Sequence, residues 1–204
     1  MDIVSMIMNQ LGNKDTMSSV AKRANTDTST VQKIAQMGLP MIMDGLNKQT
    51  TKDTKVSEEL ANSASRHADD NTDNLDHLLK NTDESEGNRL LDMAFGSKKE
   101  SVEKKVAEKT GTETSKVKSV LSMLAPLALS MIAKRSSNSQ SLTGSGVSQL
   151  LGGLTDNVKK QSSNSGYGDI LSSVFGGSDD SSDSSDSGNS TVDKAKDALG
   201  NLFK

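Results

Sequence analysis

The residues best suited to chemistry in this 204-residue chain are two histidines set among aspartates. His67 and His77 lie among four acids, which are Asp69, Asp70, Asp73 and Asp76. Imidazole nitrogens and carboxylate oxygens are common ligands of divalent metals. Their spacing matches no established metal motif, and solvated histidines and acids at a helix end are far more common than ligands. We therefore expect no metal and no cofactor.

Other catalytic patterns in the sequence are incomplete. A calcium-loop pattern begins at Asp69, Asn71 and Asp73, but Asn74 stands where glycine is needed and Lys80 where the last glutamate belongs. The chain has no cysteine, which excludes thiolate catalysis and thiolate metal ligands. No nucleophile elbow or phosphate-binding glycine loop is present. The sequence predicts a protein that is not an enzyme.

The elements that would position such side chains are helices, and the chain contains its main helical segment twice. Residues 26–48 read TDTSTVQKIAQMGLPMIMDGLNK, and residues 112–134 read TETSKVKSVLSMLAPLALSMIAK. Both carry apolar residues at helical spacing. A short helix precedes each copy, and Asn25 or Gly111 can end it in the left-handed conformation. We predict an all-α fold of two pseudo-repeated multi-helical units packed together.

The two units have predicted boundaries. The first spans residues 1–86, with helices at 2–11, about 16–24 and 56–68 and polar connections at 49–55 and 81–87. The second spans 87–177 and includes a partial third copy at 168–177. Pro40, next to Gly38, favours a break in the first copy, whereas Pro126 favours a kinked but continuous helix.

The C-terminal region has a different composition. Residues 178–190, SDDSSDSSDSGNS, contain no apolar side chain, so we predict a disordered acidic Ser-rich linker. Residues 191–204 recover helical spacing with Val192, Ala195, Leu199 and Leu202, which predicts an amphipathic helix. A free helix of this length is marginal in water, so we expect it to dock on another surface.

Composition and charge limit the remaining function classes. The chain has ten Met, three Phe, one Tyr and no Trp, so its core must be aliphatic. Its net charge of −3 argues against strong binding of nucleic acid by the whole molecule. The N-terminus is not typical of a secretory signal, and the apolar run Leu121–Ala133 is short for a bilayer span. We expect a soluble, cytoplasmic protein without stable membrane insertion.

A family resemblance rests on the pattern G-x-x-x-L-x-x-x-F-G, then V-x-x-x-V-A-x-x-T-G, then V-x-x-x-L-x-x-L-A-P. The residues that carry it are Gly87, Leu91, Phe95, Gly96, Val102, Val106, Ala107, Thr110, Gly111, Val117, Leu121, Leu124, Ala125 and Pro126. The chain resembles the YidB-like proteins, a bacterial family called domain of unknown function 937. The resemblance covers roughly residues 1–177 and implies an all-helical fold without an assigned role.

The preferred functional hypothesis is a non-enzymatic scaffold for protein–protein interaction or self-association. The stripes Met37–Leu46 and Met123–Ile132 have more apolar surface than one helical hairpin can cover. The predicted structural and interaction residues are Met37, Pro40, Leu46, Leu124, Pro126 and Met131. A protein partner or a homo-oligomer is therefore expected.

A DNA-binding role is the alternative. Residues 17–37, and again 101–121, have the spacing of a helix-turn-helix pair. Its contact residues would be Thr28, Ser29, Gln32 and Lys33. The absence of arginine from the second helix and the acidic balance favour the scaffold. A more remote alternative is peripheral membrane contact through residues 191–204.

Overall fold

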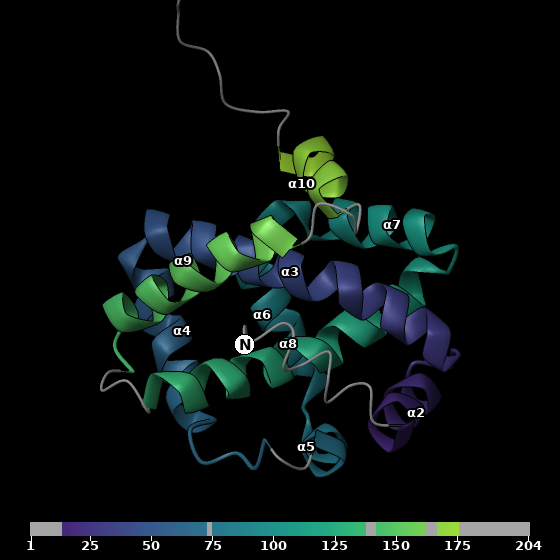
Figure 1. The fold of residues 1–204 in the computed structure, drawn as a ribbon, viewed down its shortest axis with the longest axis horizontal. Helices are drawn as coiled ribbons and strands as arrows, with labels where there is room; N and C mark the ends of the chain where they lie inside the picture. Colours follow the sequence, from purple (N-terminus) through teal and green to yellow (C-terminus); the bar gives the residue numbers. More distant parts are fainter. Residues whose placement is uncertain (1–13, 73–74, 138–141, 162–166, 176–204) are drawn as a thin grey trace, which may run out of the picture.

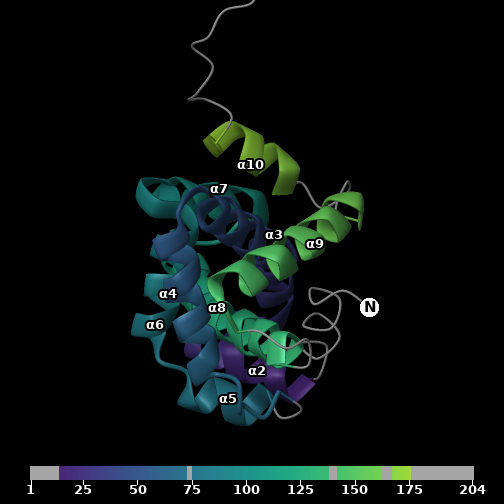
Figure 2. The same ribbon diagram turned by 90° about the vertical axis from the view of Figure 1, so that its left-hand side faces the viewer.

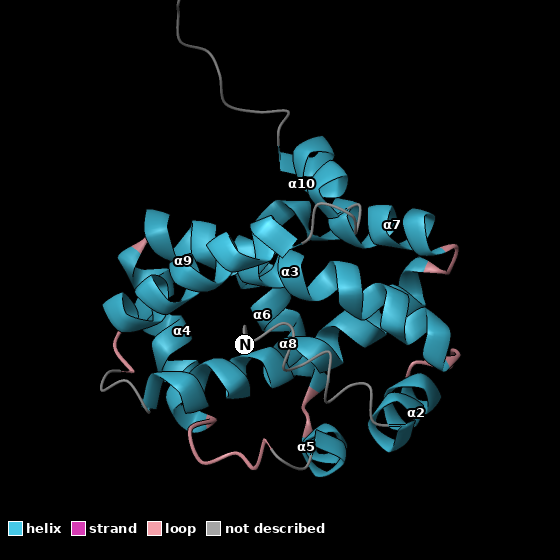
Figure 3. Ribbon diagram, viewed as in Figure 1, coloured by secondary structure: helices cyan, strands magenta, loops and turns pink. Residues whose placement is uncertain are grey.

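The computed structural model describes residues 14–72, 75–137, 142–161 and 167–175, and these residues form helices with short connections and no strand (Figures 1 and 3). The all-α prediction is confirmed. The helices are α2 (Lys14–Arg23), α3 (Thr28–Lys52), α4 (Thr54–Arg66), α5 (Leu75–Asn81), α6 (Glu84–Phe95), the 3-10 turn η1 (Gly96–Lys98), α7 (Lys99–Thr110), α8 (Thr114–Ser137), α9 (Gly144–Gln161) and α10 (Tyr167–Phe175). The predicted elements at 2–11, 178–190 and 191–204 lie outside the described residues.

Three helices begin at an aspartate that caps them. The carboxylates of Asp27, Asp53 and Asp83 accept backbone N–H bonds at the starts of α3, α4 and α6. An acid at this position satisfies an orphan donor and complements the helix dipole. Asp53 also ends α3, because its N–H donates to the Gln49 carbonyl at 2.9 Å. One residue therefore replaces the polar connection predicted for 49–55, and that prediction was wrong.

The predicted connection at 81–87 was also too long. Asp83 starts α6 at Glu84, and Gly87 lies inside that helix rather than in a linker. Polar composition suggests a loop, but the first turn of α6 is polar because it carries the acids Glu84 and Glu86, which suit a helix N-terminus.

The long helices α3 and α8 form the centre of the core, and both continue through their prolines. The break predicted at Pro40 is therefore wrong, whereas the continuous helix predicted at Pro126 is confirmed. Both prolines are buried, so packing of the surrounding helices holds each helix together across its missing hydrogen bond. Gly38 is a packing position instead, because a Cβ there would lie 2.2 Å from Leu121 Cδ2 of α8.

Helix α6 approaches both central helices at glycines. A Cβ on Gly87 would lie 1.7 Å from the Ser122 carbonyl oxygen of α8, and a Cβ on Gly45 of α3 would lie 2.6 Å from the Ala94 carbonyl oxygen of α6. Pro126, four residues after Ser122, has no N–H to donate to that carbonyl. The Ser122 carbonyl therefore faces a neighbouring helix that can come close only because its residue 87 has no side chain.

Helix α9 was not predicted from the sequence, although it closes the core. It packs across α3 and α4 and buries Val147, Leu151 and Leu154. These residues do have helical spacing, but the surrounding Gly and Ser residues are poor helix formers. Gly144 permits its close entry beside α4, since a Cβ there would meet Ser57 Oγ at 2.7 Å.

The two predicted left-handed turns are present, at Asn25 (φ 49°) and Gly111 (φ 68°). The following N–H groups make equivalent bonds, Thr26 to the Ala21 carbonyl at 2.9 Å and Thr112 to the Ala107 carbonyl at 3.1 Å. Both helix-turn-helix corners lie on the right of Figure 1. The apolar residues of both units belong to one core cluster. The repeat itself, and the division at residue 86, stay predictions.

Within the described residues, one helix is long and apolar enough to cross a membrane. It spans Thr114–Ser136, and its apolar window has a mean hydropathy of 1.4. This helix is longer than the run Leu121–Ala133, which alone is short for a bilayer span. Inside the fold, 83% of its apolar window is buried, as in the core helix of a soluble protein. This burial is consistent with a soluble protein, and the cytoplasmic location stays a prediction.

Gly87→Ala should destabilise the protein by about 3 kcal/mol or more, because the new methyl group cannot avoid the Ser122 backbone carbonyl. The matched control is Gly153→Ala, in α9, where nothing lies within 4 Å of an added Cβ. That change should be neutral or stabilise by up to about 1 kcal/mol. Urea denaturation of both variants measures the difference, and equal midpoints would contradict the close approach.

Candidate functional site

The imidazole of His67 lies between two carboxylates at the end of α4. Its Nδ1 is 2.6 Å from Asp70 Oδ2, and its Nε2 is 3.0 Å from Glu86 Oε2 of α6. His67 itself ends α4, since its backbone N–H donates to the last turn of that helix. A neutral imidazole carries one N–H, so both nitrogens can donate to carboxylates only when the ring carries two protons.

Ser130 connects this cluster to the core. Its hydroxyl Oγ lies 2.6 Å from Asp70 Oδ2 and 3.1 Å from the Pro126 carbonyl in the preceding turn of α8. Ser130 is only 1% exposed, whereas the side chain of His67 is 18% exposed. The cluster therefore joins the turn after α4 to the buried centre of α8.

Two cations lie beside the cluster. Arg66 Nη2 is 3.5 Å from Glu86 Oε1 and donates to Ser63 Oγ at 2.9 Å. Lys134 Nζ of α8 donates to Thr72 Oγ1 at 2.8 Å. These contacts fix both ends of the described turn after α4. We call His67, Asp70, Glu86 and Ser130 the His67 cluster.

The His67 cluster contains the residue types of a catalytic triad in a different arrangement. In a triad the histidine Nε2 takes the serine proton while the acid holds Nδ1. Here Glu86 occupies Nε2, and Ser130 is bonded to the acid rather than to Nε2. Ser130 Oγ also lies 3.5 Å from His67 Nδ1, the nitrogen that contacts Asp70, so its geometry differs from that of a triad serine. The contacts of the cluster join the end of α4 to α6 and α8.

The metal hypothesis receives no geometric support. In the described ranges, no group of three or more His, Asp or Glu side chains is arranged to hold a metal ion. His67 uses its ring nitrogens in the cluster, while His77 is exposed on α5 and lies beside Asn81. Asp73 and Asp76 lie where no side chain is described.

The predicted DNA-contact residues lie at the start of α3. Thr28, Ser29, Gln32 and Lys33 are all exposed, so the structure does bring them to one surface. Ser29 Oγ, however, donates to the capping carboxylate of Asp27 at 2.5 Å. Bonds from Ser29 and Thr30 lower the pKa of Asp27, so this carboxylate stays charged at the helix start.

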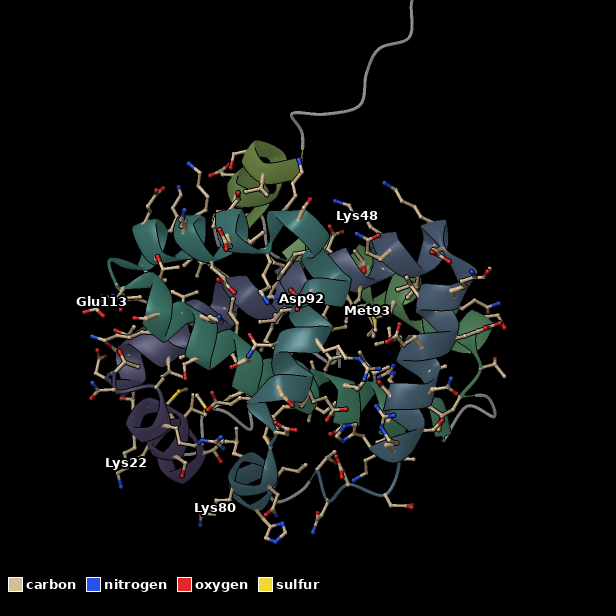
Figure 4. The ribbon with its side chains drawn as sticks, turned by 180° about the vertical axis from the view of Figure 1, so that it is seen from behind. Lys22, Lys48, Lys80, Asp92, Met93 and Glu113 are labelled. Carbon is tan, nitrogen blue, oxygen red and sulfur yellow. The ribbon has the colours of Figure 1, made fainter. Side chains whose placement is uncertain are left out.

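At each corner, one basic side chain is paired with an acid. Arg23 donates to the Leu79 and Thr82 carbonyls and pairs with Glu84 at 3.2 Å. At the second corner, Lys116 lies 3.5 Å from Glu113. Figure 4 shows Glu113 extending outward on the same side of the molecule as Lys22. The corners thus present charges of both signs.

The predicted structural and interaction residues are all buried. They are Met37, Pro40, Leu46, Leu124, Pro126 and Met131. The stripes that seemed too large for one hairpin are covered inside the chain by α6 and α9. A role of these six residues in contacts between chains stays a prediction.

Sequence reasoning singled out His67 and Asp70 but missed Glu86 and Ser130. Ser130 gave one usable signal, because it is a polar residue within an otherwise apolar run and therefore needs a buried partner. Glu86 gave none, since an acid in a first helical turn is explained by the helix dipole alone.

A buried carboxyl outside this cluster is Glu103, on the inner face of α7. It is 4% exposed, and its Oε1 has no hydrogen-bond partner. Burial raises the pKa of Glu103 above its ordinary value of 4.5, and the nearby Lys99 and Lys118 partly oppose this shift. Ionising Glu103 in the folded protein is therefore less favourable than ionising a glutamate in water.

His67→Ala should destabilise the protein by about 2–4 kcal/mol, because it leaves Asp70 and Glu86 without their shared donor. His77→Ala, on the exposed face of α5, is the control and should change stability by less than about 0.5 kcal/mol. Chemical denaturation compares them. Equal losses would show that the His67 cluster does not tie the helices together.

Glu103→Gln should stabilise the protein at neutral pH. A raised pKa means that the folded state holds the proton more tightly, so the stability of the parent protein falls as pH rises through that pKa. The advantage of the variant should vanish as pH falls below about 4.5, where Glu103 is protonated in both the folded and the unfolded protein. Melting temperatures from pH 4 to pH 8 test this sign, and a constant difference would contradict it.

Comparison with known proteins identifies a family. Residues 5–135 match the family described as bacterial protein of unknown function (DUF937). No curated protein and no solved structure matches the chain with significance. The matched range includes both helix-turn-helix corners and the whole His67 cluster, and it covers well over half of the sequence. The chain therefore belongs to the DUF937 family of bacterial proteins.

Proposed function

We propose that the chain is a non-enzymatic, cytoplasmic interaction module: a closed helical body with a C-terminal amphipathic segment, Thr191–Lys204, that binds a protein partner or a second copy. The observation that carries the proposal is the distribution of apolar residues between the core and the C-terminal segment. Both core stripes are buried within one chain. The segment after the body still carries Leu199 and Leu202 at helical spacing.

The geometry of the polar groups supports a binding role over an enzymatic one. The His67 cluster bonds its own members and ties α4, α6 and α8 together. Ser130 is too buried to meet a substrate. These contacts favour the described body as a support, and under this proposal binding uses its surface or the chain that follows it.

The C-terminal segment is suited to binding because it cannot be stable alone. An isolated helix of 14 residues is marginal in water, and it gains stability by covering its apolar face. A protein surface is the favoured target, since one short helix with a weak apolar face binds membranes poorly. A helix that lays an apolar face against a partner is a common recognition mode.

Leu199→Asp should abolish partner binding or self-association by the full-length chain, because it places a charge in the apolar face of the segment. Asn201→Asp adds the same charge on the opposite face and is the matched control. Sedimentation velocity reports self-association, and nuclease-treated pull-down from a native lysate reports partners. Melting curves of both variants should match the parent, since the change lies outside the body.

Partner recovery that is equal for Leu199→Asp and Asn201→Asp would contradict this function. Binding to liposomes that is lost only with Leu199→Asp, without any protein partner, would move the assignment to peripheral membrane contact. Each outcome is read from the same pair of variants.

DNA binding is a second candidate, favoured by the exposure of Gln32 and Lys33 on the first turns of α3. Against it, Asp27 places a carboxylate where a phosphate would approach, and Arg23 is held by α5 and the start of α6. Under this candidate, Lys33→Ala would weaken retention of DNA and reduce its salt dependence. Under the preferred function, Lys33→Ala leaves partner binding unchanged.

A further inference from the structure

Helix α10 is a short helix held on the surface of the body. It packs on α7 and α3 and buries Ile170 to 1% exposure and Val174 to 7% exposure. Its nine residues are too few for a stable free helix, so this docking is what makes it helical. Figure 2 shows α10 lying over α7 at the edge of the molecule.

The two ends of α10 are bound by opposite ends of α7. Lys98 Nζ, just before α7, donates to the Val174 carbonyl at 2.8 Å in the last turn of α10. Lys109, near the end of α7, lies 3.9 Å from Asp169 in the first turn of α10. A cation at a helix C-terminus and an acid at its N-terminus both suit the helix dipole. We call this surface of α7 and α3 the α10 site.

The sequence of α10 recurs at the C-terminus of the chain. Residues 169–175 read DILSSVF, and residues 197–203 read DALGNLF. The acid, the leucine two residues later and the final phenylalanine are identical. Ala198 stands for the buried Ile170, and Leu202 stands for the buried Val174. The second segment thus has the acid and the apolar spacing that the α10 site binds.

We propose that Asp197–Phe203 is a second ligand of the α10 site and binds there in cis, in competition with α10. Asp197 takes the place of Asp169 opposite Lys109, and Lys98 binds the carbonyl of the last turn. Leu202 fills the position of Val174. Ala198 leaves the position of Ile170 underfilled, so the segment binds more weakly than α10, and α10 is the usual occupant.

The connecting chain is long enough for this exchange. The 21 residues between Phe175 and Asp197 can extend to about 70 Å, whereas α7 is about 18 Å long. Because the segment belongs to the same chain, its effective concentration at the α10 site is of millimolar order. Even weak intrinsic affinity then gives measurable occupancy whenever α10 leaves.

The consequence is a regulated interaction. The inference rests on the proposed function in one respect, which is that Thr191–Lys204 is the segment that meets a partner. While Asp197–Phe203 occupies the α10 site, that segment is withheld. While α10 occupies the site, the segment is available, so a change that stabilises α10 should promote partner binding.

The test uses the purified full-length chain alone, so that its failure is distinct from failure to find a partner. The chain has no cysteine, and Lys204→Cys therefore provides a single position for a nitroxide spin label. The readout is paramagnetic broadening of the α7 amide signals by NMR. Ile170→Asp, which weakens α10, should produce strong broadening along α7, and Ile170→Asp with Leu202→Asp should abolish it.

Ala198→Ile provides a second variant that leaves the body unchanged. Restoring the missing side chain should raise occupancy of the α10 site by the tail about tenfold or more, with α10 still intact. Absence of α7 broadening in both Ile170→Asp and Ala198→Ile would overturn the proposal. So would broadening that survives Leu202→Asp. A mixing control uses spin-labelled chains without isotope enrichment together with isotope-enriched chains without a spin label. Broadening of equal strength in this mixture would show that the segment binds another chain, and would overturn binding in cis.

Discussion

The close contact of α6 with the two central helices is the constraint on which the fold depends. At Gly87 and Gly45, helix backbones approach so closely that no Cβ fits between them. Pro126 contributes by withholding an N–H from the Ser122 carbonyl, which Gly87 then faces. A chain with one Tyr, three Phe and no Trp has few large anchors for a core. Close approach of backbones replaces the packing that aromatic side chains usually supply.

This constraint also places the polar groups. Because α6 lies against α8, Glu86 of α6 reaches the imidazole of His67. Asp70 contacts the same imidazole and also accepts a hydrogen bond from Ser130 of α8. The contacts of the His67 cluster thus depend on the correct assembly of α4, α6 and α8. The two helix-turn-helix corners are completed by the same core, and their exposed faces carry charges of both signs.

The sequence predicted what depends on local periodicity. The apolar stripes of α3 and α8, the left-handed turns at Asn25 and Gly111, and the family all follow from spacing and residue type. Prediction from the sequence is wrong where a residue acts through a contact that is remote in sequence. The sequence predicts a helix break near Gly38 and the end of a linker at Gly87, because their neighbours Leu121 and Ser122 are remote in sequence. Helix α9 was missed since burial against α3 outweighs its poor intrinsic propensity.

The candidate site could likewise be predicted only in its local part. His67 and Asp70 are close in sequence, so they could be singled out together, whereas Glu86 and Ser130 join them only through the fold. Native-state hydrogen exchange tests the central claim most directly. If α6 is locked between its neighbours, the amides of α3, α6 and α8 should exchange together, at the free energy of global unfolding. Exchange of α6 through a separate, lower-energy opening, while α3 and α8 stay protected, would contradict it.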